Sequence, residues 1–295
     1  MDFLQPTTLS DALEAKAEHP HAVPIAGGTD VMVELNFDKH RPSALLDLNR
    51  IDELAQWAPD NGQIRLGAAV SYARVINELG ERLPGLAMAA RTVGSPQIRN
   101  RGTVGGNLGA ASPAGDSHPA LLASGATVEV ASVRGTRLIP VSEFFTGVKR
   151  NALDRDELIT AILISPASGP QQFCKIGTRN AMVIAVSAFG LALHAQDRRV
   201  GTGIGSAAPT PRRAVEAEQF LAAALTDEGL WETRAELPAS LAGEFGERVR
   251  RAAAPIDDIR GTAGYRLHSL AVMASRALSW AWRDYRRTTT PTGGA

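Results

Sequence analysis

The sequence has only one cysteine, Cys174, in 295 residues. One thiol excludes an internal disulfide framework, and it excludes a Cys₄ metal site or an iron–sulfur cluster built by this chain alone. An excess of charge is also absent, because 31 Lys and Arg residues balance 31 Asp and Glu residues. That balance argues against a protein that binds nucleic acid through its net charge. A metal or iron–sulfur centre that works with this chain must belong to a partner.

Long apolar runs are missing as well. No stretch approaches the ~20 apolar residues that cross a membrane, and the start MDFLQPTTLS lacks the basic and apolar regions of a signal peptide. Hydrophobic residues still make up 44% of the chain and charged residues 21%, as in a folded globular protein. We therefore expect a cytoplasmic protein that contacts no membrane, with a flexible, low-complexity tail over residues 288–295.

Mixed helices and strands are predicted for the first half of the chain. The segment TTLSDALEAKAEHP, with Thr8 as a cap and a stop at Pro20, predicts a helix. The following HAVPIAGGTDVMVELN predicts a strand, a turn at the glycine pair, and a helix capped by Thr29 or Asp30. Short strands and helices continue to about Ser165, so this part of the chain should be α/β.

A different pattern follows the stretch SPASGPQQF. Longer strands are expected over QFCKIGT, MVIAVSAFGLALH and RRVGTGIGSAAP, which suggests an antiparallel sheet. Helices come next, one with Pro211 in its first turn and one between Gly261 and Tyr285. We place the boundary between the two parts near residues 166–172.

Two glycine-rich loops share one chemistry, AGGTD at residues 26–30 and GTVGGN at residues 102–107. Glycine pairs let successive N–H groups turn toward one point and let a ligand approach without meeting Cβ atoms, which suits phosphate oxygens. Neither loop matches a Walker A loop or G-x-G-x-x-G, and GTGIGS at residues 201–206 only resembles the latter. The two loops could clamp a diphosphate from two sides, but ordinary turns also use Gly-Gly.

Asp116 follows the second loop and has two interpretations. A carboxylate is repelled by phosphate, so an Asp116 that faces a ligand should accept hydrogen bonds from hydroxyl or ring N–H groups of a sugar or a base. The alternative is structural, because Asp116 immediately precedes SHPALLAS and can cap a helix there. The residues alone leave both interpretations open.

The motifs together resemble the flavin subunits of the molybdenum hydroxylases, the family of xanthine dehydrogenase and carbon monoxide dehydrogenase. That family carries an A-G-G-[TS]-[DS] loop and a segment R-N-x-[GA]-[TS]-[VI]-G-G-N-[LI], followed by A-S-P-x-[GAS]-D. Here these motifs are AGGTD at residues 26–30, RNRGTVGGNL at residues 99–108 and ASPAGD at residues 111–116. The likeness extends over nearly the whole chain, including KIGTRNAMVIAVSAF at residues 175–189.

The resemblance implies an α+β chain with the vanillyl-alcohol-oxidase/PCMH-type FAD-binding fold. Two α/β subdomains, about residues 1–55 and 56–168, would form the FAD-binding domain over residues 1–168. A C-terminal domain with an antiparallel sheet and helices would cover residues 169–287. In such proteins FAD lies between the subdomains, and the third domain closes over it.

The resemblance also implies which residues bind FAD. The first loop and the segment from Thr103 would hold the pyrophosphate, and Asp116 would bond a polar part of the cofactor. Lys175 would lie near the isoalloxazine or the ribityl chain, with Val93 and Ile159 against the flavin. The full expected set is Pro24, Ile25, Ala26, Gly27, Gly28, Thr29, Asp30, Val31, Val93, Thr103, Gly105, Gly106, Asn107, Asp116, Ile159 and Lys175.

By resemblance, the chain is an FAD-dependent oxidoreductase subunit. Electrons would reach its FAD from [2Fe–2S] clusters in a small partner subunit and leave to an acceptor such as NAD. Molybdopterin is expected in a large partner subunit, and the assembly would be a dimer of heterotrimers. We expect no catalytic or metal-binding residue in this chain, because its six histidines show neither metal-ligand spacing nor a triad pattern.

Two other functions remain open. A stand-alone flavin oxidase or reductase on the same fold should carry acid–base residues in its C-terminal third, where this chain has mostly Ala, Leu, Arg and Glu at helical spacing. A scaffold that kept the loops but lost flavin would be distinguished by a failure to bind FAD.

Overall fold

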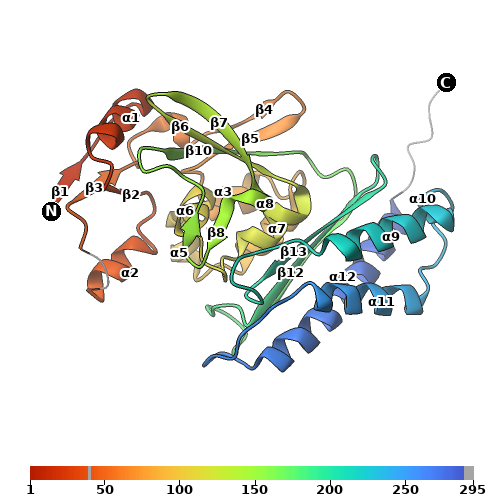
Figure 1. Ribbon diagram of the computed structural model, residues 1–295. Helices are drawn as coiled ribbons and strands as arrows, with labels where there is room; N and C mark the ends of the chain where they lie inside the picture. The colour runs from red at the N-terminus through yellow and green to blue at the C-terminus, as the bar shows by residue number, and fades with distance from the viewer. Residues whose placement is uncertain (39–40, 289–295) are drawn as a thin grey trace, which may run out of the picture.

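The structure is a computed structural model that describes residues 1–38 and 41–288. The tail that we predicted over residues 288–295 lies, from residue 289 on, outside the described residues. Figure 1 shows an N-terminal part built on two sheets and a C-terminal part in which long helices cover a third sheet. No helix in the described ranges has the length and apolarity needed to cross a bilayer.

The first sheet is parallel, with strand order β1-β3-β2. Its elements are β1 (Asp2–Leu4), α1 (Leu9–Glu18), β2 (Val23–Ile25), α2 (Val31–Asn36) and β3 (Ala44–Asp47). The predicted cap is confirmed, because Thr8 Oγ1 accepts a hydrogen bond of 3.1 Å from the Asp11 amide. All four residues of β3 are buried, so this short sheet is covered on both faces.

The second sheet has the order β4-β5-β10-β6-β7, and all of its pairs are antiparallel. Its strands are β4 (Trp57–Asp60), β5 (Gln63–Gly67), β6 (Thr127–Ser132), β7 (Gly135–Pro140) and β10 (Leu158–Ile164). A 3₁₀ turn η1 (Asp52–Leu54) leads into the sheet, and β8 (Phe145–Gly147) pairs with β9 (Arg150–Asn151) at one side.

Helices between β5 and β8 pack on this sheet to form the N-terminal core. They are α3 (Tyr72–Glu78), α4 (Pro84–Arg91), α5 (Pro96–Arg101), α6 (Val104–Ala110), α7 (Ser117–Ser124) and α8 (Val141–Phe144). The core between them includes Leu66, Leu108, Leu121 and Phe144, which are almost fully buried. The predicted α/β pattern of this half is therefore confirmed.

The predicted antiparallel sheet of the C-terminal part is also present, in the order β11-β12-β13. The elements are β11 (Gln171–Ile176), β12 (Ser187–His194), β13 (Arg199–Gly205), α9 (Val215–Asp227), α10 (Leu230–Thr233), α11 (Ala239–Arg251) and α12 (Ala263–Arg287). The position of Pro211 was predicted wrongly. The helix begins only at Val215, because Arg212 still forms a β-bridge with Ile204.

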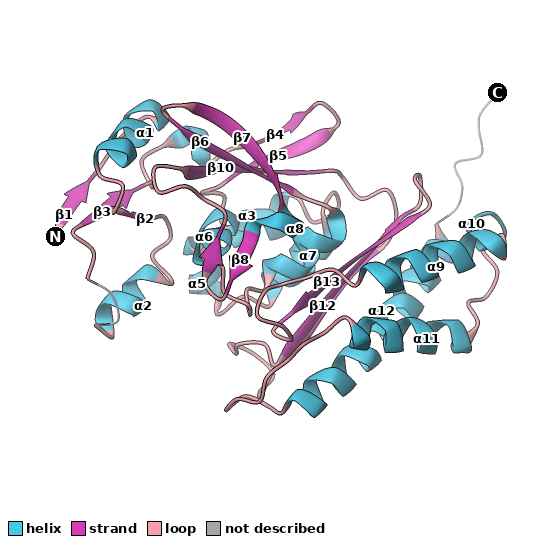
Figure 2. Cartoon of the chain, in the orientation of Figure 1, coloured by secondary structure: helices cyan, strands magenta, loops and turns pink. Residues whose placement is uncertain are grey.

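Helices α4 and α7 of the N-terminal part both contact the C-terminal sheet. Helix α7 lies against the face of β12 and β13 that is opposite to α9, α11 and α12, as Figure 2 shows. A Cβ atom on Gly203 would come within 2.1 Å of the Pro119 carbonyl oxygen of α7. The GTGIGS stretch therefore lies largely in β13, and its Gly203 allows close helix packing instead of forming a nucleotide loop.

Candidate functional site

A cavity of about 810 Å³ lies between the first sheet with α2 and the second sheet with α3, α5 and α6. This volume falls within the range of small-molecule and cofactor sites, roughly 300–1,000 Å³. Most of the residues predicted from the sequence line it, namely Pro24, Ala26, Gly27, Gly28, Thr29, Asp30, Val31, Val93, Thr103, Gly105, Gly106, Asn107 and Ile159. The other three predicted residues, Ile25, Asp116 and Lys175, are not part of the wall.

Two glycines of the loops are required where the chain packs closely, a role that the sequence analysis did not give them. A Cβ atom on Gly27 would lie 1.9 Å from the Arg101 carbonyl oxygen, and one on Gly105 would lie 2.6 Å from Ala68 Cβ. The first loop therefore packs closely on the backbone at Arg101, just before the second loop, and α6 packs closely on Ala68, just after β5. Gly28 is required for a different reason, since its φ of +73° is left-handed.

The second loop leads into the capped helix α6, and residues outside the loop hold its polar side chains in place. Thr103 Oγ1 accepts a hydrogen bond of 2.9 Å from the Gly106 amide at the start of α6. The buried Ser117 hydroxyl donates to Asn107 Oδ1 at 2.7 Å, and Tyr72 Oη is 3.4 Å from the same hydroxyl. Because Oδ1 of Asn107 is engaged, its amide nitrogen is available as a donor in the cavity wall.

Asp116 and Lys175 lie together behind the cavity wall. Lys175 Nζ donates to Asp116 Oδ2 at 2.7 Å and to the Thr92 carbonyl at 3.2 Å, next to Val93 in the wall. Asp116 occupies the N-cap position of α7, but its side chain makes no capping hydrogen bond. Burial raises the pKa of Asp116 to about 6, and Lys175 opposes this rise. Within the described part of the chain, Asp116 Oδ1 is buried without a hydrogen-bond partner.

The histidine nearest to these residues, His118, is buried in the core. Its Nε2 is 3.2 Å from the Asn107 carbonyl oxygen, and its ring contacts Phe145. Burial lowers the pKa of His118 to about 3, so the ring is neutral at physiological pH. Among residues 1–38 and 41–288, no group of His, Cys, Asp or Glu is arranged to hold a metal ion.

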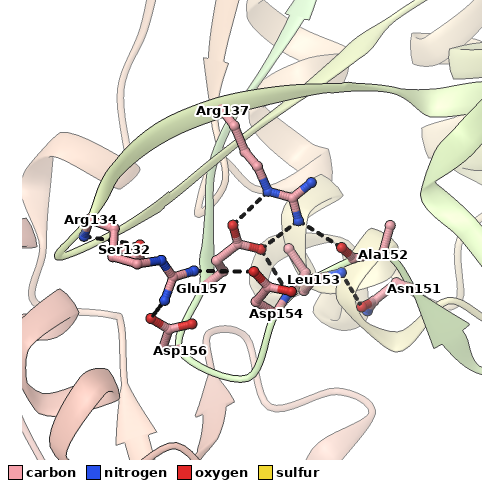
Figure 3. A network of polar contacts seen from close by, with 9 residues as sticks. All are labelled: Ser132, Arg134, Arg137, Asn151, Ala152, Leu153, Asp154, Asp156 and Glu157. Atoms are coloured by element: carbon pink, nitrogen blue, oxygen red, sulfur yellow. Dashed lines mark hydrogen bonds and ion pairs between the residues drawn. The ribbon is translucent and has the colours of Figure 1, made fainter.

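Two further parts of the wall were missed by the sequence reasoning. Lys16 of α1 is buried, and its Nζ donates to the Ala22 carbonyl at 2.7 Å and to the Pro20 carbonyl at 3.0 Å. The segment from the end of β9 to the start of β10, residues 151–157, also lines the cavity. Figure 3 shows the side chains of this segment and their polar contacts. Neither carries a glycine motif. The only available signal was the dense charge of DRDE at residues 154–157.

Two protein families match the chain, one over the N-terminal part with the first two sheets and one over the C-terminal part with the third sheet. Residues 1–167 match the family described as the FAD binding domain in molybdopterin dehydrogenase. Residues 172–281 match the CO dehydrogenase flavoprotein C-terminal domain.

Individual proteins are similar to this chain over most of its length. The nicotinate dehydrogenase FAD-subunit of Eubacterium barkeri is 36% identical over 68% of this chain and 71% of its own length. The xanthine dehydrogenase FAD-binding subunit of Escherichia coli O157:H7 is 31% identical over 93% of both chains. A chain in the structure of reconstituted CO dehydrogenase from Oligotropha carboxidovorans superposes with a TM-score of 0.86 at 25% identity, over 96% of this chain and 98% of that one. The resemblance and fold class predicted from the sequence are thereby confirmed, and the chain belongs to the FAD-binding subunits of the xanthine dehydrogenase family of molybdenum hydroxylases.

Proposed function

We propose that this chain carries FAD in the 810 Å³ cavity and transfers electrons within a molybdenum hydroxylase. Electrons would arrive from [2Fe–2S] clusters of a small partner subunit and leave to an acceptor such as NAD. The observation that carries the proposal is the wall itself, in which both glycine loops and the apolar side chains of Val93 and Ile159 line one cavity.

The residues of the wall suit the parts of FAD in different ways. Backbone amides near Gly28, with the side-chain amide of Asn107, would donate to the diphosphate. Val93 and Ile159 would contact the flat, apolar ring system. Bound FAD would supply the exchange between one-electron carriers and a two-electron acceptor. The chain's own residues would orient the cofactor and exclude water from it.

The buried pair of Asp116 and Lys175 supports a polar contact with the cofactor. Among the residues that the structure describes, none donates a hydrogen bond to the buried Asp116 Oδ1, so a ligand hydroxyl or ring N–H would satisfy it. Lys175 Nζ is held against the Thr92 carbonyl, one residue before Val93. Neither side chain lines the cavity in this structure, so the contact would require one of them to move to the wall.

Partner subunits would complete the enzyme. The single cysteine cannot build an iron–sulfur cluster, so the [2Fe–2S] clusters would lie in a small subunit and the molybdopterin in a large one. We propose a cytoplasmic dimer of such heterotrimers, as the family resemblance implies.

The test is to purify the chain from its native host without dissociating partners, and to identify the released small molecules and the co-purifying subunits. FAD together with a molybdopterin subunit and a [2Fe–2S] subunit in equal amounts is the expected result. FAD without partners would instead favour a stand-alone flavin oxidoreductase. Absence of flavin, even after FAD is added back, would favour a scaffold that lost the cofactor.

A further inference from the structure

The segment of residues 151–157 forms a wall of the cavity without regular secondary structure through most of its length. Its shape is set by side chains. Asn151 Oδ1 accepts from the Leu153 amide at 3.2 Å, and Glu157 Oε2 accepts from the Asp154 amide at 2.7 Å. Asn151 Nδ2 also donates to the Gly109 carbonyl of α6 at 2.9 Å. The segment is therefore a defined turn, tied to the helix that follows the second glycine loop.

Two arginines of the β6–β7 hairpin, Arg134 and Arg137, bind the acidic residues of this segment, as Figure 3 shows. Arg137 of β7 donates to Glu157 Oε1 at 2.6 Å and to Oε2 at 2.7 Å, and its Nη2 also reaches the Ala152 carbonyl at 2.8 Å. Arg134 pairs with Asp154 at 3.1 Å and with Asp156. The two-pronged contact of Arg137 is the geometry in which a guanidinium binds a carboxylate most strongly.

Glu157 differs from the other acidic residues of the cavity. Asp30 and Asp154 are exposed and Glu34 is half-buried, whereas Glu157 is 5% exposed. Arg137 lowers the pKa of Glu157 below its usual value, so the carboxylate is charged at neutral pH. A buried charge costs several kcal/mol unless it is paired. Both oxygens of Glu157 are already occupied, so this carboxylate contributes charge, not a free acceptor, to the wall.

We infer that Arg137 neutralises the buried Glu157 carboxylate and thereby makes this wall compatible with an anionic diphosphate ligand. The inference rests on the proposed function for the identity of the ligand, FAD. Without the guanidinium, a desolvated negative charge would face a cavity that has to accept two phosphate charges. Repulsion between such charges is poorly screened inside a protein. Arg137 would thus not touch the ligand itself; it would hold Glu157 in place and offset its negative charge.

Charged groups of both signs lie around Glu157, and they include Arg155 of the same segment, which also lines the cavity. Arg134 meets Asp154 and Asp156 from the hairpin. Lys16 of α1 interacts electrostatically with Asp156. Removal of Arg137 leaves the Glu157 carboxylate without its two-pronged partner, and its carboxyl pKa should rise. Asp116, with a pKa of about 6, titrates in the same range, so each variant is compared with the wild type at the same pH.

The experiment measures dissociation constants for FAD and for ADP-ribose, which carries the same diphosphate without a flavin, at pH 6 and pH 8. The variants are Arg137→Met, Glu157→Gln and the double variant. Arg65→Met is the matched control, since Arg65 pairs with Glu129 at 2.6 Å on the same sheet but neither residue lines the cavity. Thermal unfolding of the ligand-free proteins reports whether each variant is folded.

We expect Arg137→Met to weaken both ligands about tenfold at pH 8 and less than about threefold at pH 6, because Glu157 takes up a proton. The double variant and Arg65→Met should stay within about threefold of the wild type at both pH values, and Glu157→Gln alone should bind as tightly or more tightly. A double variant as weak as Arg137→Met, or a tenfold loss in Glu157→Gln, would overturn the inference.

The two ligands separate this inference from the proposed function. If the wild-type chain binds ADP-ribose but not FAD, the proposed cofactor is wrong, while the dependence on Arg137 is still measured. If it binds FAD and Arg137→Met changes neither its affinity nor its pH dependence, the function stands and the role of Arg137 is refuted. If the wild-type chain binds neither ligand, both proposals fail.

Discussion

Lys175 Nζ lies 2.7 Å from Asp116 Oδ2 although the two residues are 59 positions apart, and both side chains are largely buried. Burial still outweighs the attraction, because the pKa of Asp116 is raised from 3.8 to about 6. Between these two pH values the folded protein binds more protons at this site than the unfolded chain. Asp116 therefore makes the free energy of unfolding fall as the pH rises from about 4 to 6, by roughly 3 kcal/mol.

Asp116→Asn should remove this dependence. The difference in the free energy of unfolding between wild type and variant is expected to shift by roughly 2 to 3 kcal/mol between pH 4 and pH 7, and to be constant above pH 7. Urea unfolding at a series of pH values measures it. Lys175→Met serves as the reciprocal variant, since loss of the ammonium should move the titration of Asp116 to higher pH. A pH-independent difference between wild type and Asp116→Asn would contradict the assignment.

Glycine substitutions in α6 should separate packing from ligand access. Gly105→Val places its side chain against Ala68, at 2.6 Å for Cβ alone, so it should destabilise the N-terminal part and abolish FAD retention. Gly109 also lines the cavity, but a Cβ there meets only Ile159 Cδ1, at 3.9 Å. Gly109→Ala is therefore the control and should be neutral or stabilise the helix by about 0.5–1 kcal/mol.

Thermal unfolding and bound flavin content measure both glycine variants. The C-terminal helices pack in a separate core around Phe245 and Trp282, so they should stay folded in Gly105→Val. Full flavin content in that variant would show that the second loop does not hold the diphosphate.

Both glycine-rich loops found in the sequence line the cavity. The cap of Thr103 on its own helix is a local structure that short spacing reveals, whereas the contacts of Gly27 with Arg101 and of Gly105 with Ala68 join distant parts of the chain and could not be read from the motifs. Lys16 and Arg137 could not be found in this way. Their contacts with the wall depend on how α1 and β7 pack, and the residue types are common on any surface.

One wrong prediction and one open alternative that the structure does not support have physical causes of the same kind. Pro211 fits the first turn of a helix, yet the chain there continues the sheet through the bridge between Arg212 and Ile204. Asp116 has the residue type and position of a helix cap, but Lys175 from β11 competes for its carboxylate. In both places a tertiary contact outweighs a local preference.

The hydroxyl of Ser117 should matter for ligand affinity although it does not line the cavity. Ser117→Ala would leave Asn107 Oδ1 without its 2.7 Å donor, so the amide of Asn107 would be free to rotate. We expect FAD to bind about five- to tenfold more weakly, in line with roughly 1 kcal/mol for a buried hydrogen bond. Tyr72→Phe is the control, since Tyr72 Oη is at 3.4 Å from Ser117 and does not reach Asn107. Titration by fluorescence measures both, and equal affinities in the two variants would argue against an ordering role for Ser117.

Val93 offers a direct test of where the ring system lies. Val93 lines the cavity, and hydrogen bonds hold the backbone around it. The carbonyl of Thr92 accepts from Lys175 Nζ. The carbonyls of Val93 and Gly94 accept from Arg99 Nη1, each at 3.1 Å. An aromatic ring at this position should stack on the isoalloxazine and tighten FAD binding by about 0.5–1.5 kcal/mol.

Val93→Tyr and Val93→Phe form the matched pair for this test. Both should bind FAD more tightly than wild type, but only the tyrosine should strongly quench the fluorescence of the bound flavin, because a phenol in contact with the ring donates an electron and a phenyl ring does not. Titration of each variant with FAD gives affinity and quenching together. If the two variants keep wild-type affinity and equal fluorescence, the isoalloxazine does not lie against Val93, and Ile159 at the other end of the predicted contact would be the next position to substitute.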